Sequence, residues 1–342
     1  MKIRLLDVAR AAGVSTATVD RVVNNRKGVG NKTSEKVRLV LTRLAEAEAV
    51  DLESRISNAA KREFHFLIPG GSEMFLENMA EEVEKKGADL SLFGVRPRVL
   101  RMKAFDPVSI ATQVRQAADQ SDGICLVAID HPLVNEAVDA AVEQGVPVVT
   151  LVSDLKRSRR LAYVGIDNFT AGRLVGYLMG RFLGERSGKV ALIAGSLTYR
   201  GHAERELGFR SVIGEEFPHL QILFAREAQD ENELTRTETC DLLANHPDLV
   251  GIYNIGGGSP GVASALVDAG RENVVFIAHE LNSLTRRFLV NGVIEAIIDQ
   301  DPAREIASAM RILMNHHAGR DLWANVDAPH LGVFFRENLP SI

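Results

Sequence analysis

Seven short apolar runs follow one another between residues 64 and 299, and they restrict the fold of this 342-residue chain more than any other feature. The runs span 64–69, 123–129, 147–152, 189–195, 249–255, 274–280 and 294–299. Stretches with apolar residues at helical spacing lie between them, at 74–86, 132–144, 168–184, 201–214 and 260–269. Strands that are apolar along their whole length are buried on both faces, so the alternation predicts parallel sheets covered by helices. Residues 63–342 can form two such sheets, which predicts a two-lobed, Rossmann-like α/β body.

Polar side chains stand where several of these apolar runs end. Ligands of α/β sheets bind beyond the carboxyl ends of the strands, often in a cleft between domains. The candidates are Asp130, Asn254, His279, Glu280 and Gln300. Carboxylates and amides can each bridge two hydroxyl groups, which suits a sugar or polyol. Asp130 precedes His131 and Pro132, so it could equally cap the next helix.

Charge is distributed unevenly along the chain. Residues 1–45 contain ten Lys or Arg and three acids, a net charge of +7, whereas the whole chain carries −5. The remaining residues, 46–342, therefore carry −12. A small basic module on a large acidic body indicates a head that binds a polyanion and a body that does not.

The basic head has the spacing of three short helices. The first is expected over 5–12, ended by Gly13, and the second is expected to begin after Ser15 as its N-cap. The residues expected in the core are Leu5, Val8, Ala9, Ala12, Val19, Val22, Val23, Val37, Val40, Leu41 and Leu44. Thr33 or Ser34 is expected to cap the third helix. A helix, a tight glycine-containing turn and a second helix with a short polar outer face predict a helix-turn-helix.

The outer face of the second helix suits a DNA groove. Thr16 and Ala17 are short enough for close approach to base edges, and Arg21 can donate two hydrogen bonds to guanine. Ser15, Thr18, Asn24 and Thr33 are donors suited to phosphates, which fix register without reading sequence. Asp20 shares this face. Its carboxylate could orient Arg21 or accept a hydrogen bond from a cytosine amino group.

The stretch "LLDVARAAGVSTATVDRVVNN", followed by "GVGNKTSEKV", resembles the headpiece of the lactose-repressor (LacI/GalR) family. The resemblance implies that Thr16, Ala17 and Arg21 occupy base-reading positions. At Asp20 the family usually has a serine that contacts phosphate.

The body resembles the family's effector domain, which is related to type I periplasmic sugar-binding proteins, at "VGIDNFTAGRLVGYLM", "GKVALIAGS", "HPDLVGIYNIGGG" and "VVFIAHE". The resemblance adds Phe75, as an aromatic against a sugar ring, and Arg205, before "GF", to the ligand candidates. The family usually has aspartate where this chain has His279 and Glu280, which argues for a ligand unlike the common hexoses.

The expected domains are a headpiece at 1–46, a hinge at 47–62 and an effector and dimerisation domain at 63–342. One lobe would hold about 63–166 and 298–332, the other about 167–297 and 333–342, with crossovers near Asp167, Ile297 and Val333. In this family a hinge helix wedges a leucine pair into the minor groove. Leu52 or Ile56 could be that wedge, but residues 46–55 hold four acids and one arginine, so a plain solvated helix is an equal alternative.

Other functional classes find less support in the residues. The first twelve residues lack an apolar signal segment and no long apolar run spans a membrane, so a cytoplasmic location is expected. "GERSGKV" lacks the spacing of a P-loop, and "GGGSPG" at 256–261 is more simply a strand-to-helix turn than a phosphate cradle. No nucleophile–base pair or metal-ligand cluster is evident. An enzyme, a cofactor and a metal are therefore not expected.

Together these features predict a ligand-responsive transcriptional regulator that binds double-stranded operator DNA of near-palindromic sequence as a homodimer. Its effector would be a small sugar or polyol-like molecule. The ending "RENLPSI" contains no leucine heptad, which favours a dimer over a tetramer. The alternative is a sugar-binding or sugar-processing protein with a vestigial head.

Overall fold

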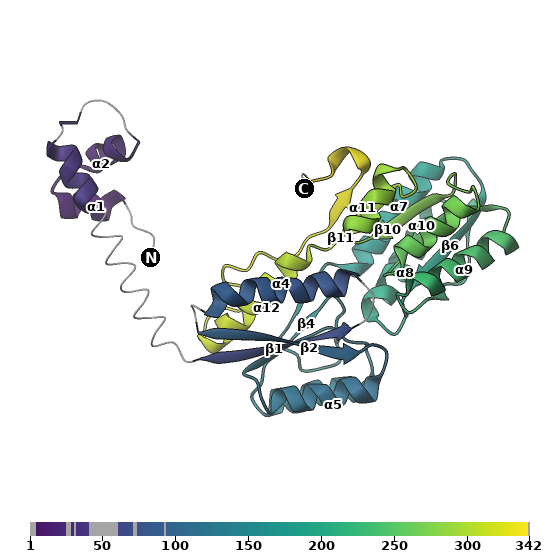
Figure 1. Cartoon of the computed structure of the whole chain (residues 1–342), viewed down its shortest axis with the longest axis horizontal. Coiled ribbons are helices and arrows are strands. Elements are labelled where there is room, and N and C mark those ends of the chain that lie inside the picture. The colour runs from purple at the N-terminus through teal and green to yellow at the C-terminus, as the bar shows by residue number, and fades with distance from the viewer. Residues whose placement is uncertain are drawn as a thin grey trace. The chain divides into compact units, whose positions relative to one another are not determined.

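The computed structural model describes residues 5–24, 29–30, 32–40, 61–70, 74–91 and 94–340 (Figure 1). The chain divides into two compact units. Met1–Lys61 with Leu90–Gly94 form the first, and Arg62–Asp89 with Val95–Ile342 form the second. The candidate hinge residues Leu52 and Ile56 lie outside the described residues.

The first unit contains helices α1 (Leu5–Ala12) and α2 (Thr16–Val23), and residues 32–40 are also helical. Their core consists of Val8, Ala9, Ala12, Val19, Val22 and Val37, all buried. Leu5 and Val23 were expected in this core, but they are 44% and 52% exposed. Leu5 is the first residue of α1 and Val23 is the last residue of α2, and at these helix ends the side chains face solvent.

Ser15 caps α2 as predicted, because its hydroxyl accepts from the backbone N–H of Thr18 at 3.2 Å. Gly13 has the left-handed conformation expected of a residue that ends a helix (φ 63°). The capping role predicted for Thr33 or Ser34 is wrong. Both lie inside helical residues 32–40, and both backbone N–H groups donate to the carbonyl of Gly30.

The first sheet of the second unit has the order β2-β1-β3-β4-β5, and all its neighbouring strands are parallel. Its strands are β1 (Arg62–Gly70), β2 (Val95–Lys103), β3 (Gly123–Leu126), β4 (Val148–Leu151) and β5 (Ala162–Val164). Helix α5 (Pro107–Ala118) covers one face together with α6 (Pro132–Glu143), whereas α4 (Met74–Ser91) and α12 (Pro302–His317) lie on the other side (Figure 1). The sheet is thus buried on both faces, as continuous apolar strands require.

The second sheet has the order β12-β11-β10-β9-β6-β7, with β8 beside β6. Its strands are β6 (Gly188–Ala194), β7 (Leu220–Ile222), β8 (Arg226–Glu227), β9 (Leu249–Asn254), β10 (Val275–His279), β11 (Ala296–Asp299) and β12 (Gly332–Phe334). Only the pairing of β12 with β11 is antiparallel within the described strands. One face packs on α7 (Asn168–Leu183) and α8 (Arg200–Glu216). The other packs on α9 (Asn232–Asn245), α10 (Ser259–Asp268) and α11 (Ser283–Val290).

The chain passes between the two sheets three times. The first passage lies between β5 and α7, the second between β11 and α12, and the third between α12 and β12. The second passage consists of Gln300 and Asp301, because β11 continues in the second sheet to Asp299. Residues 298–299, placed by the sequence in the first lobe, therefore belong to the second sheet.

Strand β2 is the main element that the apolar runs do not predict. Its sequence, "VRPRVLRMK", alternates charged and apolar residues around Pro97. The strand lies at the edge of its sheet, where a missing backbone N–H is tolerated and one side meets solvent. An edge strand does not need the continuous apolar character that identified the central strands.

Candidate functional site

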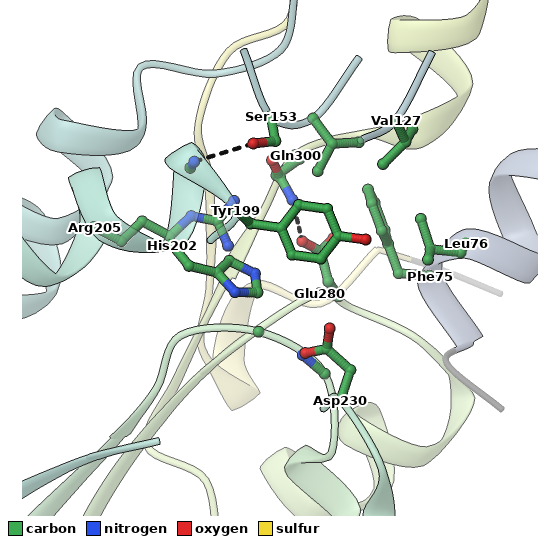
Figure 2. Close-up of a pocket in the computed structure, with 14 residues that line it drawn as sticks. Phe75, Leu76, Val127, Ser153, Tyr199, His202, Arg205, Asp230, Glu280 and Gln300 are labelled. Carbon is green, nitrogen blue, oxygen red and sulfur yellow. Dashed lines mark hydrogen bonds between the residues drawn. The ribbon is translucent and has the colours of Figure 1, made fainter. Parts of the chain in front are cut away.

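A cavity of about 500 Å³, counting its open mouth, lies where the two sheets meet in the second unit. Figure 2 shows Arg205 and His202 on one side of it and Phe75 and Leu76, from α4, on the other. The lining residues are Phe75, Leu76, Val127, Val152, Ser153, Tyr199, Gly201, His202, Arg205, Asp230, Gly256, Gly257, Glu280 and Gln300. Such a combination of aromatic, apolar and polar planar groups is typical of small-molecule sites.

Arg205 reaches the cavity from α8 and is buried (2% exposed). Its Nε donates to Asn168 Oδ1 at 2.7 Å, and its Nη1 donates to the carbonyl of Ile255 at 2.8 Å. Both partners are neutral, so they fix the direction of the guanidinium without cancelling its charge. Arg205 is therefore a rigid positive group at the cavity wall.

The position of Arg205 depends on close packing of α7 and α8. A Cβ added to Gly172 would lie 2.0 Å from the carbonyl oxygen of Arg205, and one on Gly208 would lie 2.1 Å from that of Phe169. Only glycine permits this approach of two helix backbones. The glycines of these helices thus set the depth at which Arg205 enters the cavity.

Asp230 enters the cavity from the loop between β8 and α9. Its Oδ1 accepts from the backbone N–H of Gly257 at 2.6 Å. Cβ atoms on Gly195 and Gly256 would lie 2.2 Å and 2.5 Å from its carboxylate, so glycine is required around it. Burial raises the pKa of Asp230 to about 6, although the Gly257 hydrogen bond opposes the shift.

Glu280 and Gln300 meet where the chain leaves the second sheet. Gln300 Nε2 donates to Glu280 Oε1, and both side chains are buried. Gln300 Oε1 has no hydrogen-bond partner within the described residues, although it is buried and its residue lines the cavity. A ligand hydroxyl or amine could donate to it.

A second chamber, of about 410 Å³ when its open mouth is counted, adjoins the first. The two share Asp230, Gly256, Gly257 and Glu280 in their linings. His279 lines the second chamber, and its Nε2 lies 2.8 Å from the hydroxyl of Tyr253. Burial and the positive charge of Arg205 lower the pKa of His279 well below its usual range, so this imidazole is neutral.

Five non-glycine residues with positive φ lie in or beside these chambers. They are Val152 (61°), Gln229 (51°), Asp230 (59°), Glu280 (69°) and Asp301 (56°). Left-handed backbone is uncommon for such residues and strained for a β-branched one. Backbone strain gathers at functional sites, so this cluster supports the cavity as the candidate site.

The structure separates the predicted ligand residues into three groups. Phe75, Arg205, Glu280 and Gln300 line the first chamber, and His279 lines only the second. Asp130, also predicted to bind the ligand, lies outside both linings. Its carboxylate accepts from Asn135 at 2.9 Å and lies 3.7 Å from Arg200, so it organises the start of α6.

Asn254, also predicted to bind the ligand, is outside both linings. Its Nδ2 donates to the carbonyls of Gly256 and Gly257 and to Ser259 Oγ. These bonds hold the glycine-rich loop against the cavity. Asn254 is a positioning residue for that loop.

Sequence reasoning missed Asp230, His202, Tyr199 and Ser153. Asp230 follows β8, which has only two residues and carries no apolar run. A signal was present in "YRGHAERE", where His202 and Arg205 are three residues apart and so share a helix face.

The first unit holds the candidate DNA-reading helix, α2. Thr16, Ala17 and Arg21 are exposed, as base-reading residues must be before DNA binds. Asn24 Nδ2 donates to Asp20 Oδ1 at 2.7 Å. Asp20 thus fixes the direction of the Asn24 amide.

Within the described part of the chain, no helix is long and apolar enough to cross a membrane. No group of three or more His, Cys, Asp or Glu in those ranges is arranged to hold a metal ion.

Comparison with known protein families assigns both parts of the chain. Residues 4–45 match the description "Bacterial regulatory proteins, lacI family", and residues 64–321 match "Periplasmic binding protein domain". The chain therefore belongs to the periplasmic binding protein domain family and carries a lacI-family regulatory domain at its N-terminal end.

Curated relatives agree with this assignment. The chain is 28% identical over 215 residues to the HTH-type transcriptional repressor PurR of Erwinia tasmaniensis, covering 61% of this chain and 59% of that protein. It is 26% identical over 229 residues to the regulator DegA of Bacillus subtilis, covering 63% and 62%. It is 25% identical over 215 residues to the sucrose operon repressor of Streptococcus mutans, covering 63% of each. The chain thus spans about three fifths of the length of these relatives.

Solved structures establish the two-lobed periplasmic-binding-protein fold of the body. A glucose-galactose binding protein, GanP from Geobacillus stearothermophilus, aligns with a TM-score of 0.74 at 23% identity, covering 83% of this chain and all of that one. A solute-binding protein from Burkholderia graminis in complex with D-arabinose aligns with a TM-score of 0.75 at 22% identity, covering 83% and 99%. At these identities the likeness shows the fold alone.

Proposed function

We propose that this protein is a transcriptional regulator that binds double-stranded operator DNA and responds to a small sugar or polyol-like effector. The observation that carries the proposal is the combination, in one chain, of a helix α2 with an exposed polar face and a two-chamber cavity between two sheets. Relatives named as the HTH-type transcriptional repressor PurR and as a sucrose operon repressor support the first part. Structural neighbours named for sugar binding support the second.

The regulator acts as a homodimer on a near-palindromic site in this proposal, because a two-fold protein presents two identical recognition helices to two half-sites. Thr16, Ala17 and Arg21 read base edges, while Ser15 and Thr18 contact phosphates. Ser15 Oγ and Thr18 Oγ1 lie 2.9 Å apart at the start of α2, where donors to phosphate are usual.

The effector binds where both lobes contribute side chains. Phe75 comes from one lobe, Arg205 and Asp230 come from the other, and Gln300 lies on the passage between them. A ligand that contacts all of these favours a particular arrangement of the lobes. It alters DNA affinity only to the extent that it binds the two arrangements unequally.

Selection of DNA by the full chain from a random pool, followed by binding at several salt concentrations, tests the regulator. A selected near-palindromic sequence bound at least a hundredfold more tightly than random DNA is expected. Equal binding of all sequences at every salt concentration would contradict the proposal. It would favour the alternative of a sugar-binding protein with a vestigial head.

Arg205→Ala tests the effector site on the selected DNA. The variant should bind this DNA normally and lose its response to any sugar that shifts the wild-type protein. Arg210→Ala is a matched control, because Arg210 also lies on α8 but pairs with Glu206 outside the cavity. Since Arg205 is buried, Gln300→Ala provides a second variant if Arg205→Ala does not fold. A retained response in both would show that the effector binds elsewhere.

A further inference from the structure

Two side chains meet across the first passage between the lobes. Tyr163 lies on β5, a strand of the first sheet, and Asn168 is the first residue of α7, in the second lobe. Asn168 Nδ2 donates to the Tyr163 hydroxyl at 3.1 Å, and this hydroxyl lies 3.0 Å from the carbonyl oxygen of Ile166. Residues 164–167, which contain the passage, are therefore enclosed by a hydrogen bond between the side chains on either side of them.

The amide of Asn168 is also bonded to the cavity wall. Its Oδ1 accepts from Arg205 Nε at 2.7 Å, and its Nδ2 donates to the carbonyl of Val152 at 3.2 Å. Arginine offers donors only, so Oδ1 must face Arg205 and Nδ2 must face Tyr163 and Val152. Asn168 is 2% exposed, so turning its amide alone would leave buried polar groups without partners. The direction of this amide is thus tied to that of the Arg205 guanidinium.

The bonds made by Asn168 run from one lobe to the other. Asn168 belongs to the second lobe, whereas its acceptors Tyr163 and Val152 belong to the first. Beside them, the backbone N–H of Gly201, on α8, donates to Ser153 Oγ at 3.2 Å, which also joins the lobes (Figure 2). The lobes are therefore connected by side-chain hydrogen bonds at the cavity wall as well as by the chain itself.

Close packing limits how these groups can rearrange. A Cβ on Gly165 would lie 2.3 Å from the Tyr163 hydroxyl, and one on Gly201 would lie 3.0 Å from Asn168 Nδ2. Burial raises the pKa of Tyr163, so the hydroxyl keeps the proton that it donates. A movement of the Asn168 amide must therefore be accompanied by a movement of the passage itself.

A ligand in the first chamber can act on this network through Arg205. The guanidinium has five N–H donors in one plane, and two of them serve Asn168 and Ile255. The other three have no hydrogen-bond partner within the described residues. Because the plane is rigid, a ligand that turns the guanidinium toward itself also turns the Nε–H group that Asn168 accepts. Asn168 must then follow Arg205 or lose this bond.

We propose that Asn168 and Tyr163 are positioning residues that relay the direction of the Arg205 guanidinium to the first passage and so set how the two lobes are arranged. The inference rests on the proposed function, because it names how the effector site regulates the same protein. A network that only stabilised the fold would not make the arrangement of the lobes depend on Arg205.

Distances between spin labels on the two lobes of the full chain, measured by double electron–electron resonance, test the relay without any ligand. One label is attached to Cys240, which is exposed on α9, and the other to Glu136→Cys, at an exposed position on α6. Cys125 is buried and should not be labelled. The labelled chain is mixed with an excess of unlabelled chain, so that a dimer reports the distance within one protomer.

Arg205→Lys keeps the positive charge but removes the planar group that Asn168 accepts from. It should shift the mean distance between the lobes by about 1–2 Å. In the Tyr163→Phe background the same substitution should cause no further shift, because the relay is already broken. An unchanged distance in Arg205→Lys, or equal shifts in the two backgrounds, would overturn the inference. Arg205→Gln and Asn168→Ala are the second variants if Arg205→Lys or Tyr163→Phe does not fold.

Tyr177→Phe is the matched control. It removes a tyrosine hydroxyl from the outer face of α7, where Tyr177 is 46% exposed. In this background the shift caused by Arg205→Lys should be retained in full. Chemical denaturation of each variant measures stability separately. Lower stability of Tyr163→Phe together with a retained shift would assign the network to folding alone and overturn the relay.

The outcomes separate this inference from the proposed function. The distances are measured without DNA or sugar, so a chain that selects no DNA sequence would remove the regulator and leave the relay standing. Equal Arg205→Lys shifts in both backgrounds, with a selected operator whose binding responds to a sugar, would remove the relay and leave the regulator.

Discussion

Gly172 of α7 lies directly against the backbone of Arg205 of α8, where a Cβ would stand 2.0 Å from the Arg205 carbonyl oxygen. This contact links a helix-packing residue to the guanidinium at the cavity wall. A residue that never touches the effector is thereby expected to control the response to it.

Gly172→Ala should destabilise the protein by about 2–4 kcal/mol, because the two helix backbones must separate to admit one methyl group. Chemical denaturation measures this, and effector titration should show a weakened response. Gly214→Ala is the matched control on α8, since no atom lies within 4 Å of its added Cβ. This control should be neutral or gain up to about 1 kcal/mol. Equal effects of the two substitutions would contradict the packing argument.

Arg21→Ala should cost about 1–3 kcal/mol of binding to the selected operator and little on random DNA. The reason is that an exposed arginine on α2 can form two hydrogen bonds to guanine. Fluorescence anisotropy on both DNAs measures the difference. Arg10→Ala, an exposed arginine of α1, should weaken both DNAs alike. A uniform loss for Arg21→Ala would assign Arg21 to phosphate contact.

Asp20→Ser should separate two roles of the acid on the recognition helix. Asp20 accepts from the Asn24 amide, so the substitution releases Asn24 as well as removing a negative charge. A change of preference at one base pair would show that Asp20, directly or through Asn24, reads sequence. A rise in affinity for every sequence would instead show that the acid suppresses non-specific binding. Repeating the DNA selection with the variant distinguishes these outcomes.

Asp230 should make stability fall as pH rises through about 4 to 6. Its pKa in the folded state is raised to about 6, so between the unfolded and folded values the native state binds the extra proton. Deprotonation then removes about 1–3 kcal/mol, and the loss levels off above pH 7. Asp230→Asn should remove this part of the pH dependence. Thermal unfolding of both proteins from pH 4 to 8 measures it, and parallel profiles would count against the assignment.

Glu305→Gln should stabilise the protein at neutral pH. Glu305 is fully buried, and neither carboxyl oxygen has a hydrogen-bond partner within the described residues. Burial, and then the charge of Glu280, hold the pKa of Glu305 well above its usual range. Because the folded state favours the proton, the wild-type chain loses stability as pH rises, and the gain from glutamine should grow from pH 5 to pH 8 by about 1–3 kcal/mol. A pH-independent difference would show that Glu305 does not titrate in the folded state.

The sequence predicted the central architecture because buried parallel strands must be apolar throughout. It did not predict β2, whose edge position tolerates Pro97 and charged residues. Phe75, Arg205, Glu280 and Gln300 were found by their positions after strands or in family motifs, and the structure places them in one lining. The sequence did not predict Asp230 as a site residue. Its carboxylate fits into the cavity wall only because Gly195 and Gly256, from distant segments, leave room for it, and no local pattern reveals this packing. Asp130 and Asn254 stand at comparable strand ends. Asp130, however, accepts a hydrogen bond from Asn135, and Asn254 donates to the carbonyl of Gly257, so both side chains stabilise local structure.

Val152, in the cavity wall, is a strained residue whose replacement would stabilise the protein. It is a β-branched residue at φ 61°, in a tight turn closed by the N–H of Ser153 and the carbonyl of Leu151 at 2.5 Å. Such a backbone costs about 1–3 kcal/mol, which Val152→Gly would relieve. Laboratory evolution for heat resistance alone should therefore find its first gains at the cavity wall. Variants selected in this way would tend to survive heating while becoming insensitive to the effector, so thermostable clones need to be screened for their response to the effector as well.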